Sequence, residues 1–295
     1  MNSKKTKSIP LRRDFFCNLL FMGWYRYVNA LSLDVVAGAV ISTLFFARLL
    51  AVKMPTEIMV TLALAVWTIY TFDHLWDAYR SKHPMLTFRH QIHQKHFRKL
   101  AFMTVLSLLA GLFLMQRLPG TTISYGIAIS LMVLFYFLIT GWLSTTTIYH
   151  KEILIALIYT GGVLVGPLSL RHHPISPTEV VLMVQFLLLA FVNLLIFAYY
   201  ESDIDRLQQF PSLLASIGSK MSRYLIVITL SLIATISLVL VFYTINDHIV
   251  ASSYSIVLIM TGILTLVFYF PRIFAVNDRF RFVGDAIFFV PLLVL

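Results

Sequence analysis

The chain has 295 residues and a net charge of +10, and 59% of its residues are hydrophobic while only 12% are charged. Its mean hydropathy of +0.85 is far from that of a soluble globular domain, so that class is excluded. We expect an all-α, polytopic integral membrane protein. The basic excess is typical of cytoplasmic loops and of contact with anionic lipid, so we expect no nucleic-acid partner.

Apolar runs long enough to cross a hydrocarbon core of roughly 30 Å recur along the chain. They predict about nine transmembrane helices, at residues 32–52, 57–77, 99–116, 121–143, 152–170, 177–200, 223–243, 252–271 and 280–295. Residues 1–30 are basic, with Arg12, Arg13 and Arg26 among aromatic and leucine residues, and we expect an amphipathic segment at the membrane interface. Residues 31–295 then form a single transmembrane helical domain.

Connections rich in basic residues alternate with connections that contain few. The rich set begins with the N-terminal segment and continues with Arg80, Lys82, Arg89, Lys95, Arg98, Lys99, Lys151, Arg206, Lys220, Arg223, Arg272, Arg279 and Arg281. The opposite set contains Lys53, Arg117 and Arg171. By the positive-inside rule we expect a cytoplasmic N-terminus and an outside C-terminus, in a multi-pass protein of a bacterial inner membrane.

The fifth predicted helix is rich in small residues, with Gly161 and Gly162 followed by Gly166 and Pro167. Small residues allow membrane helices to pack closely, and proline can be accommodated there as a kink. The same residues are also suited to line a cavity for a lipid tail. The sequence leaves both interpretations open.

Five of the 13 acidic residues fall in two short segments, each at the predicted cytoplasmic end of a helix. The first segment, FDHLWDAYR, contains Asp73 and Asp77. The second, YYESDIDRLQQF, contains Glu201, Asp203 and Asp205. If the helices continue through these segments, acidic residues four apart lie on one helical face, where their like charges repel.

A bound divalent cation would remove this repulsion. Carboxylate oxygens are ligands that Mg²⁺ prefers, and water and phosphate complete its coordination shell. The alternative is that these are solvated loop carboxylates paired with Arg80 and Arg206.

These segments resemble the UbiA superfamily of intramembrane prenyltransferases, which have nine helices and two Asp-rich motifs on cytoplasmic loops after the second and sixth helices. The first family motif is N-D-x-x-D-x-x-x-D. Its last two acidic positions match Asp73 and Asp77, and Ile69 and Tyr70 stand in place of its Asn and first Asp. The stretch NLLIFAYYESDIDRLQQFPSLLASIG, which begins at Asn193, resembles the second motif.

The resemblance implies a prenyl diphosphate donor, a lipophilic acceptor and a Mg²⁺ cofactor held by Asp73, Asp77, Glu201 and Asp205. The stretch YHKEILIALIYTGGVLVG resembles the family's connection between the fourth and fifth helices, which implies catalytic roles for Tyr149 and Lys151. Substrate-binding roles are implied for Arg80, Lys82, Arg89, His90, Asn193, Asp203 and Arg206.

Two other hypotheses remain open. His90, His93 and His96 recur at three-residue steps, and imidazole together with carboxylate suits iron, as in a metal-dependent membrane oxygenase or desaturase. A non-catalytic transporter or scaffold is the other alternative, because Asp34 and Asp285 lie at the predicted membrane edge.

Overall fold

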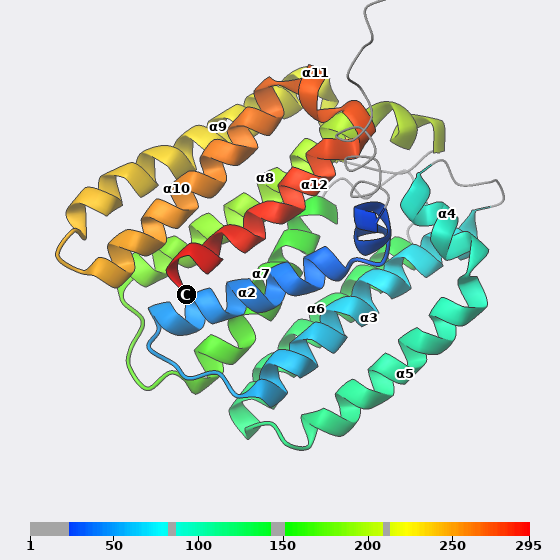
Figure 1. Cartoon of the computed structure of the whole chain (residues 1–295). Coiled ribbons are helices and arrows are strands. Elements are labelled where there is room, and N and C mark those ends of the chain that lie inside the picture. The colour runs from blue at the N-terminus through cyan, green and yellow to red at the C-terminus, as the bar shows by residue number, and fades with distance from the viewer. Residues whose placement is uncertain (1–23, 82–86, 143–150, 209–212) are drawn as a thin grey trace, which may run out of the picture.

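The structure is a computed structural model that describes residues 24–81, 87–142, 151–208 and 213–295 (Figure 1). For residues 141–142, 203–208 and 215 it describes the backbone alone. Across the described ranges the chain is helical and contains no strand. The predicted all-α class is therefore confirmed for these residues.

A short helix, Trp24–Ala30, precedes the labelled elements. These elements are α2 (Leu33–Leu49), α3 (Thr56–Arg80), α4 (Phe88–Lys95), α5 (Phe97–Met115), α6 (Gly120–Trp142), α7 (Lys151–Leu170), α8 (Pro177–Gln208), α9 (Leu213–Tyr243), α10 (His248–Tyr269), α11 (Pro271–Phe274), η1 (Val276–Asp278), α12 (Arg279–Ala286) and η2 (Ile287–Val294), where η marks a 3₁₀ helix. The nine predicted segments correspond in chain order to α2, α3, α5 to α10, and α12 together with η2.

Seven of the described helices, α3 and α5 to α10, are long and apolar enough to cross a membrane. An eighth crossing arises if Trp24–Ala30 and α2, which meet at a bend of 70°, form one broken span. The chain is therefore a multi-pass helical membrane protein. The ninth span and the orientation stay predictions, since the last segment is an eight-residue α-helix followed by an eight-residue 3₁₀ helix that contains Pro291.

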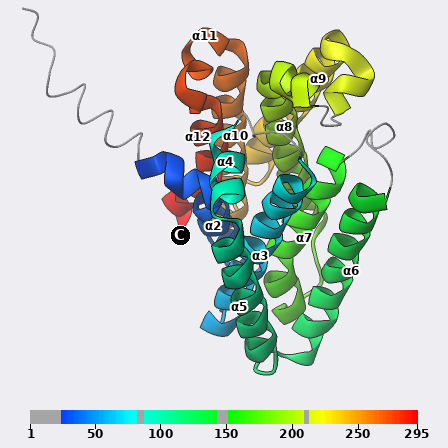
Figure 2. The same cartoon turned by 90° about the vertical axis from the view of Figure 1, so that its right-hand side faces the viewer.

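The connections gather at two ends of the helical bundle (Figure 2). The helices α4 and α11 and the start of α9 lie at one end, and the turn between α5 and α6 lies at the other. We call the first the charged end, because the elements that come together there carry Arg80 at the end of α3, Arg89 in α4, Glu201 in α8 and Arg281 in α12. The two acidic segments, at the ends of α3 and α8, therefore lie at the same end of the bundle.

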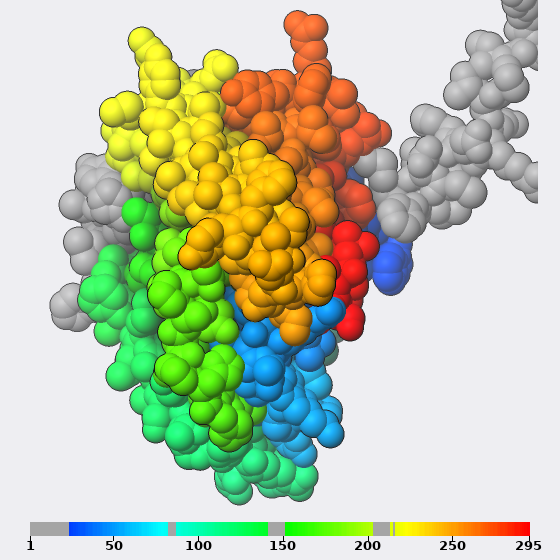
Figure 3. Space-filling view, turned by 90° about the vertical axis from the view of Figure 1, so that its left-hand side faces the viewer, coloured from blue at the N-terminus to red at the C-terminus, as the bar shows by residue number. Residues whose placement is uncertain are grey.

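Helix α8 is the central helix of the bundle. In its apolar stretch of 18 residues, 61% is buried inside the protein, against 17% for the corresponding stretch of α5 and 11% for that of α6. Phe186 and Val192 of α8 are fully enclosed by neighbouring helices. The apolar side chains exposed on α5 and α6 therefore face lipid. Helices α9 and α10 pack side by side on another face, where Ile228 and Ile259 are exposed (Figure 3).

Candidate functional site

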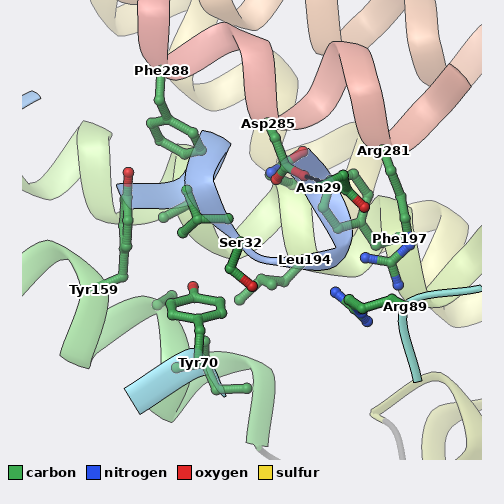
Figure 4. A pocket seen from close by; sticks show the side chains of 15 residues that line it. Asn29, Ser32, Tyr70, Arg89, Tyr159, Leu194, Phe197, Arg281, Asp285 and Phe288 are labelled. Carbon is green, nitrogen blue, oxygen red and sulfur yellow. Dashed lines mark hydrogen bonds between the residues drawn. The ribbon is translucent and has the colours of Figure 1, made fainter. Parts of the chain in front are cut away.

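Two cavities meet inside the bundle. A pocket of about 70 Å³ lies near the charged end, and its polar lining consists of Asn29, Ser32, Tyr70, Arg89, Tyr159, Asn193, Arg281 and Asp285 (Figure 4). A cavity of about 250 Å³ lies between α3, α6 and α7, and most of the side chains that line it are apolar. Because Tyr70, Ile155 and Tyr159 line both, the polar pocket adjoins the apolar cavity.

The glycines of α7 shape the apolar cavity. Gly162 and Gly166 both line it; a Cβ added at Gly162 would meet only Leu62 Cδ1, at 3.9 Å, whereas one added at Gly166 would lie 2.5 Å from Met54 Cε. Gly161 instead faces α6, where an added Cβ would lie 2.5 Å from Ile129 Cδ1. Both interpretations of this small-residue run therefore apply: Gly161 and Gly166 permit close packing, and Gly162 and Gly166 border the cavity.

The first acidic segment lies on α3, which continues to Arg80, so Asp73 and Asp77 share a helix as the spacing predicts. Asp73 lines the apolar cavity, and its Oδ1 accepts a hydrogen bond from the Tyr136 hydroxyl at 3.0 Å. Asp77 lies one turn nearer the charged end, with Oδ2 3.7 Å from His90 Nε2. The segment thus places one carboxylate on the cavity wall and one at the end of α3.

The two residues that replace the family's Asn and first Asp have defined positions. Ile69 and Tyr70 both line the apolar cavity, and Tyr70 also lines the polar pocket. At these positions an apolar side chain and a phenol ring stand where the family motif would supply polar ligands.

The second acidic segment is joined to the C-terminal part of the chain. Glu201 forms a two-pronged ion pair with Arg281, in which Nε donates to Oε1 at 2.6 Å and Nη2 donates to Oε2. Their side chains are only 15% and 12% exposed. The guanidinium also lies over the Phe197 ring, with Cζ 5.0 Å from the ring centroid. Arg281 is therefore fixed in position from two sides.

Sequence reasoning did not select Arg281 as a site residue. It is 80 positions from Glu201, so no local spacing reveals the pair. One signal was present, because Arg281 and Asp285 are charges four residues apart in an otherwise apolar final segment.

Arg89 of α4 points into the polar pocket beside Arg281 (Figure 4). Among the described residues, none forms a hydrogen bond or ion pair with its guanidinium, although α4 itself packs on α3. Burial and the nearby positive charge of Arg281 both lower the pKa of Arg89. The pocket therefore contains one arginine with a carboxylate partner and one that faces open space.

Two cationic side chains lie near both acidic segments. Lys151, which begins α7, and Arg89 lie close enough to act electrostatically on Asp73, Asp77 and Glu201. The structure thus brings these five predicted site residues into one region at the charged end.

Other predicted residues fall elsewhere or are only partly described. Lys82 and Tyr149 lie outside the described residues, and Asp203, Asp205 and Arg206 are described by their backbone alone. They lie in α8, which continues to residue 208. Positions 201 and 205 therefore belong to one continuous helix and lie on one face of it, as their spacing predicts.

Two predicted substrate-binding residues have different surroundings. Arg80 is exposed, and its Nη1 donates to the Thr140 carbonyl oxygen at 2.6 Å, which links α3 to α6. Asn193 is 3% exposed and lines the polar pocket, where no described residue bonds its Oδ1. Asn193 therefore offers an amide to a ligand, whereas Arg80 joins two helices.

A buried polar network closes the pocket on the side of Trp24–Ala30. Asn29 Nδ2 donates to Asp34 Oδ2 at 2.8 Å and to Asp285 Oδ2 at 3.0 Å. The Tyr25 hydroxyl donates to the same oxygen of Asp34 at 2.8 Å. These two acids therefore share an amide donor, and Asp285 also lines the pocket. Asn29 and Tyr25 were not predicted, because no local pattern in the sequence shows that Asn29 bonds Asp285 or that Tyr25 bonds Asp34.

Three histidines pack together where α4 meets α3. The ring centroid of His74 lies 5.3 Å from that of His90 and 5.0 Å from that of His93. His90 Nδ1 shares a hydrogen bond with Thr87 Oγ1 at 2.6 Å, and His93 Nδ1 donates to the Arg89 carbonyl oxygen at 2.9 Å. Burial lowers the pKa of His90 and of His93, so both rings are neutral at pH 7.

Potential metal ligands are present throughout the part of the chain that the structure describes. No group of three or more His, Cys, Asp or Glu side chains there is arranged to hold a metal ion. The three neighbouring imidazoles therefore do not form such a group.

No known family model, curated protein or solved structure matches this chain. Fold and site together define its class, a multi-pass helical membrane protein with a two-arginine polar pocket beside an apolar cavity. Its resemblance to the UbiA superfamily stays an expectation based on the two acidic segments.

Proposed function

We propose that this protein is an intramembrane prenyltransferase that moves an isoprenoid chain from a prenyl diphosphate to a lipophilic, membrane-associated acceptor. The supporting observation is that the polar pocket and the apolar cavity adjoin at Tyr70 and Tyr159. A prenyl diphosphate is an anion with a long apolar tail. Arg89 and Arg281 suit the anion, and the cavity between α3, α6 and α7 suits the tail.

Mg²⁺ fits the first acidic segment by the chemistry of its donors. We place it on Asp73 and Asp77, with Asp205 as a ligand from the second segment. Glu201, expected from the sequence as a further ligand, instead uses both carboxylate oxygens to accept from Arg281. Asp73 uses Oδ1 to accept from Tyr136, and no described residue donates to its Oδ2. Mg²⁺ needs few protein ligands, because phosphate and water complete its shell. When bound, it would neutralise charge on the departing diphosphate.

The chain's own residues have separate parts in this reaction. The bond between the allylic carbon and the diphosphate oxygen breaks, and Lys151 and Arg89 stabilise the negative charge of the leaving group. Tyr70 and Tyr159 stand where head and tail meet, and their ring faces stabilise the positive charge on the carbon. The acceptor forms the new bond to that carbon, and its proton passes to Asp285 on the pocket wall.

The test uses purified protein with Mg²⁺, a membrane lipid extract and radiolabelled prenyl diphosphates of several lengths. We expect a labelled lipid product and a loss of at least about 100-fold in rate for Asp73→Asn. Glu57→Gln is the matched control, because Glu57 is exposed at the opposite end of the same helix. Absence of product with every donor, or full activity in Asp73→Asn, would rule the proposal out.

The buried, unsatisfied ring of His74 is the observation for a second candidate, a metal-dependent membrane oxygenase or desaturase, although the described side chains form no three-ligand metal group. His74 is 4% exposed, and neither of its ring nitrogens has a hydrogen-bond partner among the described residues. Near-stoichiometric iron in the purified protein that is lost in His74→Leu would support this candidate. Retention of prenyl transfer in His74→Leu would support a packing role for the three rings.

A further inference from the structure

The positively charged guanidinium of Arg281 is held in one position by its contacts. Its guanidinium is fixed by two hydrogen bonds to Glu201 and by the ring of Phe197 beneath it. Three of its N–H groups are not used by the two bonds to Glu201. An arginine held this way loses little conformational entropy when it binds a ligand.

Arg89 faces the same space from another element. It lies in the first turn of α4, where unpaired backbone N–H groups give the helix end a partial positive charge. Its guanidinium lies beside that of Arg281 (Figure 4); Glu201 pairs directly with Arg281 alone, and Asp285 on the same pocket wall acts electrostatically on both arginines. Two like charges side by side in a partly buried pocket repel, and an anion between them removes the repulsion.

We propose that Arg89 and Arg281 form an oxyanion site that holds the phosphate groups of a ligand directly, without a divalent cation. Glu201 then acts as a positioning residue that orients Arg281. Asn193, whose amide also lines the pocket, is placed to contribute a further hydrogen bond. This site rests on the proposed function for its natural ligand, a prenyl diphosphate. Both arginines would bind the diphosphate, and Arg89 would also stabilise it as the bond breaks, when Mg²⁺ would supply further positive charge.

The experiment measures binding of inorganic pyrophosphate to the full chain in phosphatidylcholine nanodiscs, with EDTA present. We expect saturable binding that Arg89→Gln weakens by about tenfold or more, because a charge-assisted pair of hydrogen bonds is lost. Arg89→Gln breaks no hydrogen bond or ion pair with any described residue, so it tests binding without loss of the fold. Arg279→Gln is the matched control, since Arg279 is exposed on the same helix as Arg281.

Arg281 requires a paired design, because removing it alone leaves Glu201 buried without a partner. The double variant Glu201→Gln/Arg281→Gln keeps the shape of the pair without its charges. We expect it to fold and to lose pyrophosphate affinity by about tenfold as well. Nanodiscs that contain phosphatidic acid distinguish a lipid head group from a free phosphate, since a bound lipid would compete with pyrophosphate.

The outcomes separate this site from the proposed function. Absence of pyrophosphate binding in EDTA, or equal binding in wild type and Arg89→Gln, would overturn the two-arginine site even if prenyl transfer with Mg²⁺ is observed. Metal-independent binding that depends on both arginines, in a protein that transfers no prenyl group, would support the site and contradict the transferase. Competition by phosphatidic acid would support the site with a lipid as its occupant.

Discussion

Charged residues at the site are compensated in different ways. Glu201 has a full ion-pair partner in Arg281, and Asp34 and Asp285 share the amide of Asn29. Burying a charge without such partners is costly. Arg89 differs from these residues, since no described residue pairs with it, and an unpaired guanidinium at a pocket is a feature expected of a binding residue.

The histidine cluster predicts a loss of stability in acid. Burial lowers the pKa of His90 in the folded state, and the positive charge of Arg89 lowers it further. The unfolded chain therefore binds more protons than the folded one. The stability contributed by the neutral ring is complete above the ordinary histidine pKa of about 6.5. It decreases as the pH falls from that value to the pKa of the folded state. His90 alone should lower the free energy of unfolding by about 1.4 kcal/mol between about pH 7.5 and about pH 5.5.

Thermal stability in detergent at these two pH values tests this expectation. The His90→Gln variant should lose part of the acid sensitivity, whereas His96→Gln should retain all of it, because His96 is exposed at the end of the same helix. Equal pH dependence in wild type and His90→Gln would contradict the assignment of the effect to His90.

At the scale of elements, the site depends on how closely α12 approaches α8. Gly284 makes this possible, because an added Cβ would lie 2.4 Å from Phe197 Cε1 and 2.5 Å from Asn193 Oδ1. The same short helix presents Arg281 and Asp285 to the pocket. Gly284 therefore sets the distance at which these charges meet their partners on α8 and Asn29.

Gly284→Ala should destabilise the protein by about 1–3 kcal/mol, because overpacking forces side chains and helices to shift. It should also weaken pyrophosphate binding, since α12 moves with Arg281. Gly262→Ala in α10 is the control, as nothing lies within 4 Å of its added Cβ. Thermal unfolding and pyrophosphate titration of both variants give the comparison, and equal stability of the two would show that Gly284 has no packing role.

Sequence patterns predict elements well where the pattern is local. The apolar runs give the positions of α3 and α5 to α10, and the spacing of Asp73 and Asp77 correctly places them on one helix. The pairing of Arg281 with Glu201 depends on the packing of α12 against α8, and no local pattern contains that information. For the same reason Asn29, which lies 256 positions from Asp285, is absent from the predicted site.

At the scale of the whole molecule, the pocket and the cavity form one amphiphilic space. The polar part is at the charged end, where α4, α8 and α12 meet, and the apolar part lies between α3, α6 and α7. A ligand bound here would have its charge at the end of the bundle and its tail among the helices, the same polarity as a lipid in the surrounding membrane.

The size of the apolar cavity should limit the length of the prenyl chain. Gly162 lines it, and an added Cβ would meet only Leu62 Cδ1, at 3.9 Å, so a larger side chain can enter the cavity without disturbing the backbone. Gly162→Phe should lower the rate with geranylgeranyl diphosphate relative to geranyl diphosphate by about tenfold or more, because the long tail loses its space while the head group keeps both arginines.

Gly111→Phe is the control for a bulky substitution in a membrane helix, since Gly111 lies on α5 with nothing within 4 Å of an added Cβ and does not line the cavity. The ratio of turnover for the two donors should match wild type in this variant. Pyrophosphate affinity should be unchanged in Gly162→Phe, because the substitution lies in the apolar part of the space. A donor ratio that Gly162→Phe leaves unaltered would show that the tail binds somewhere other than between α3, α6 and α7.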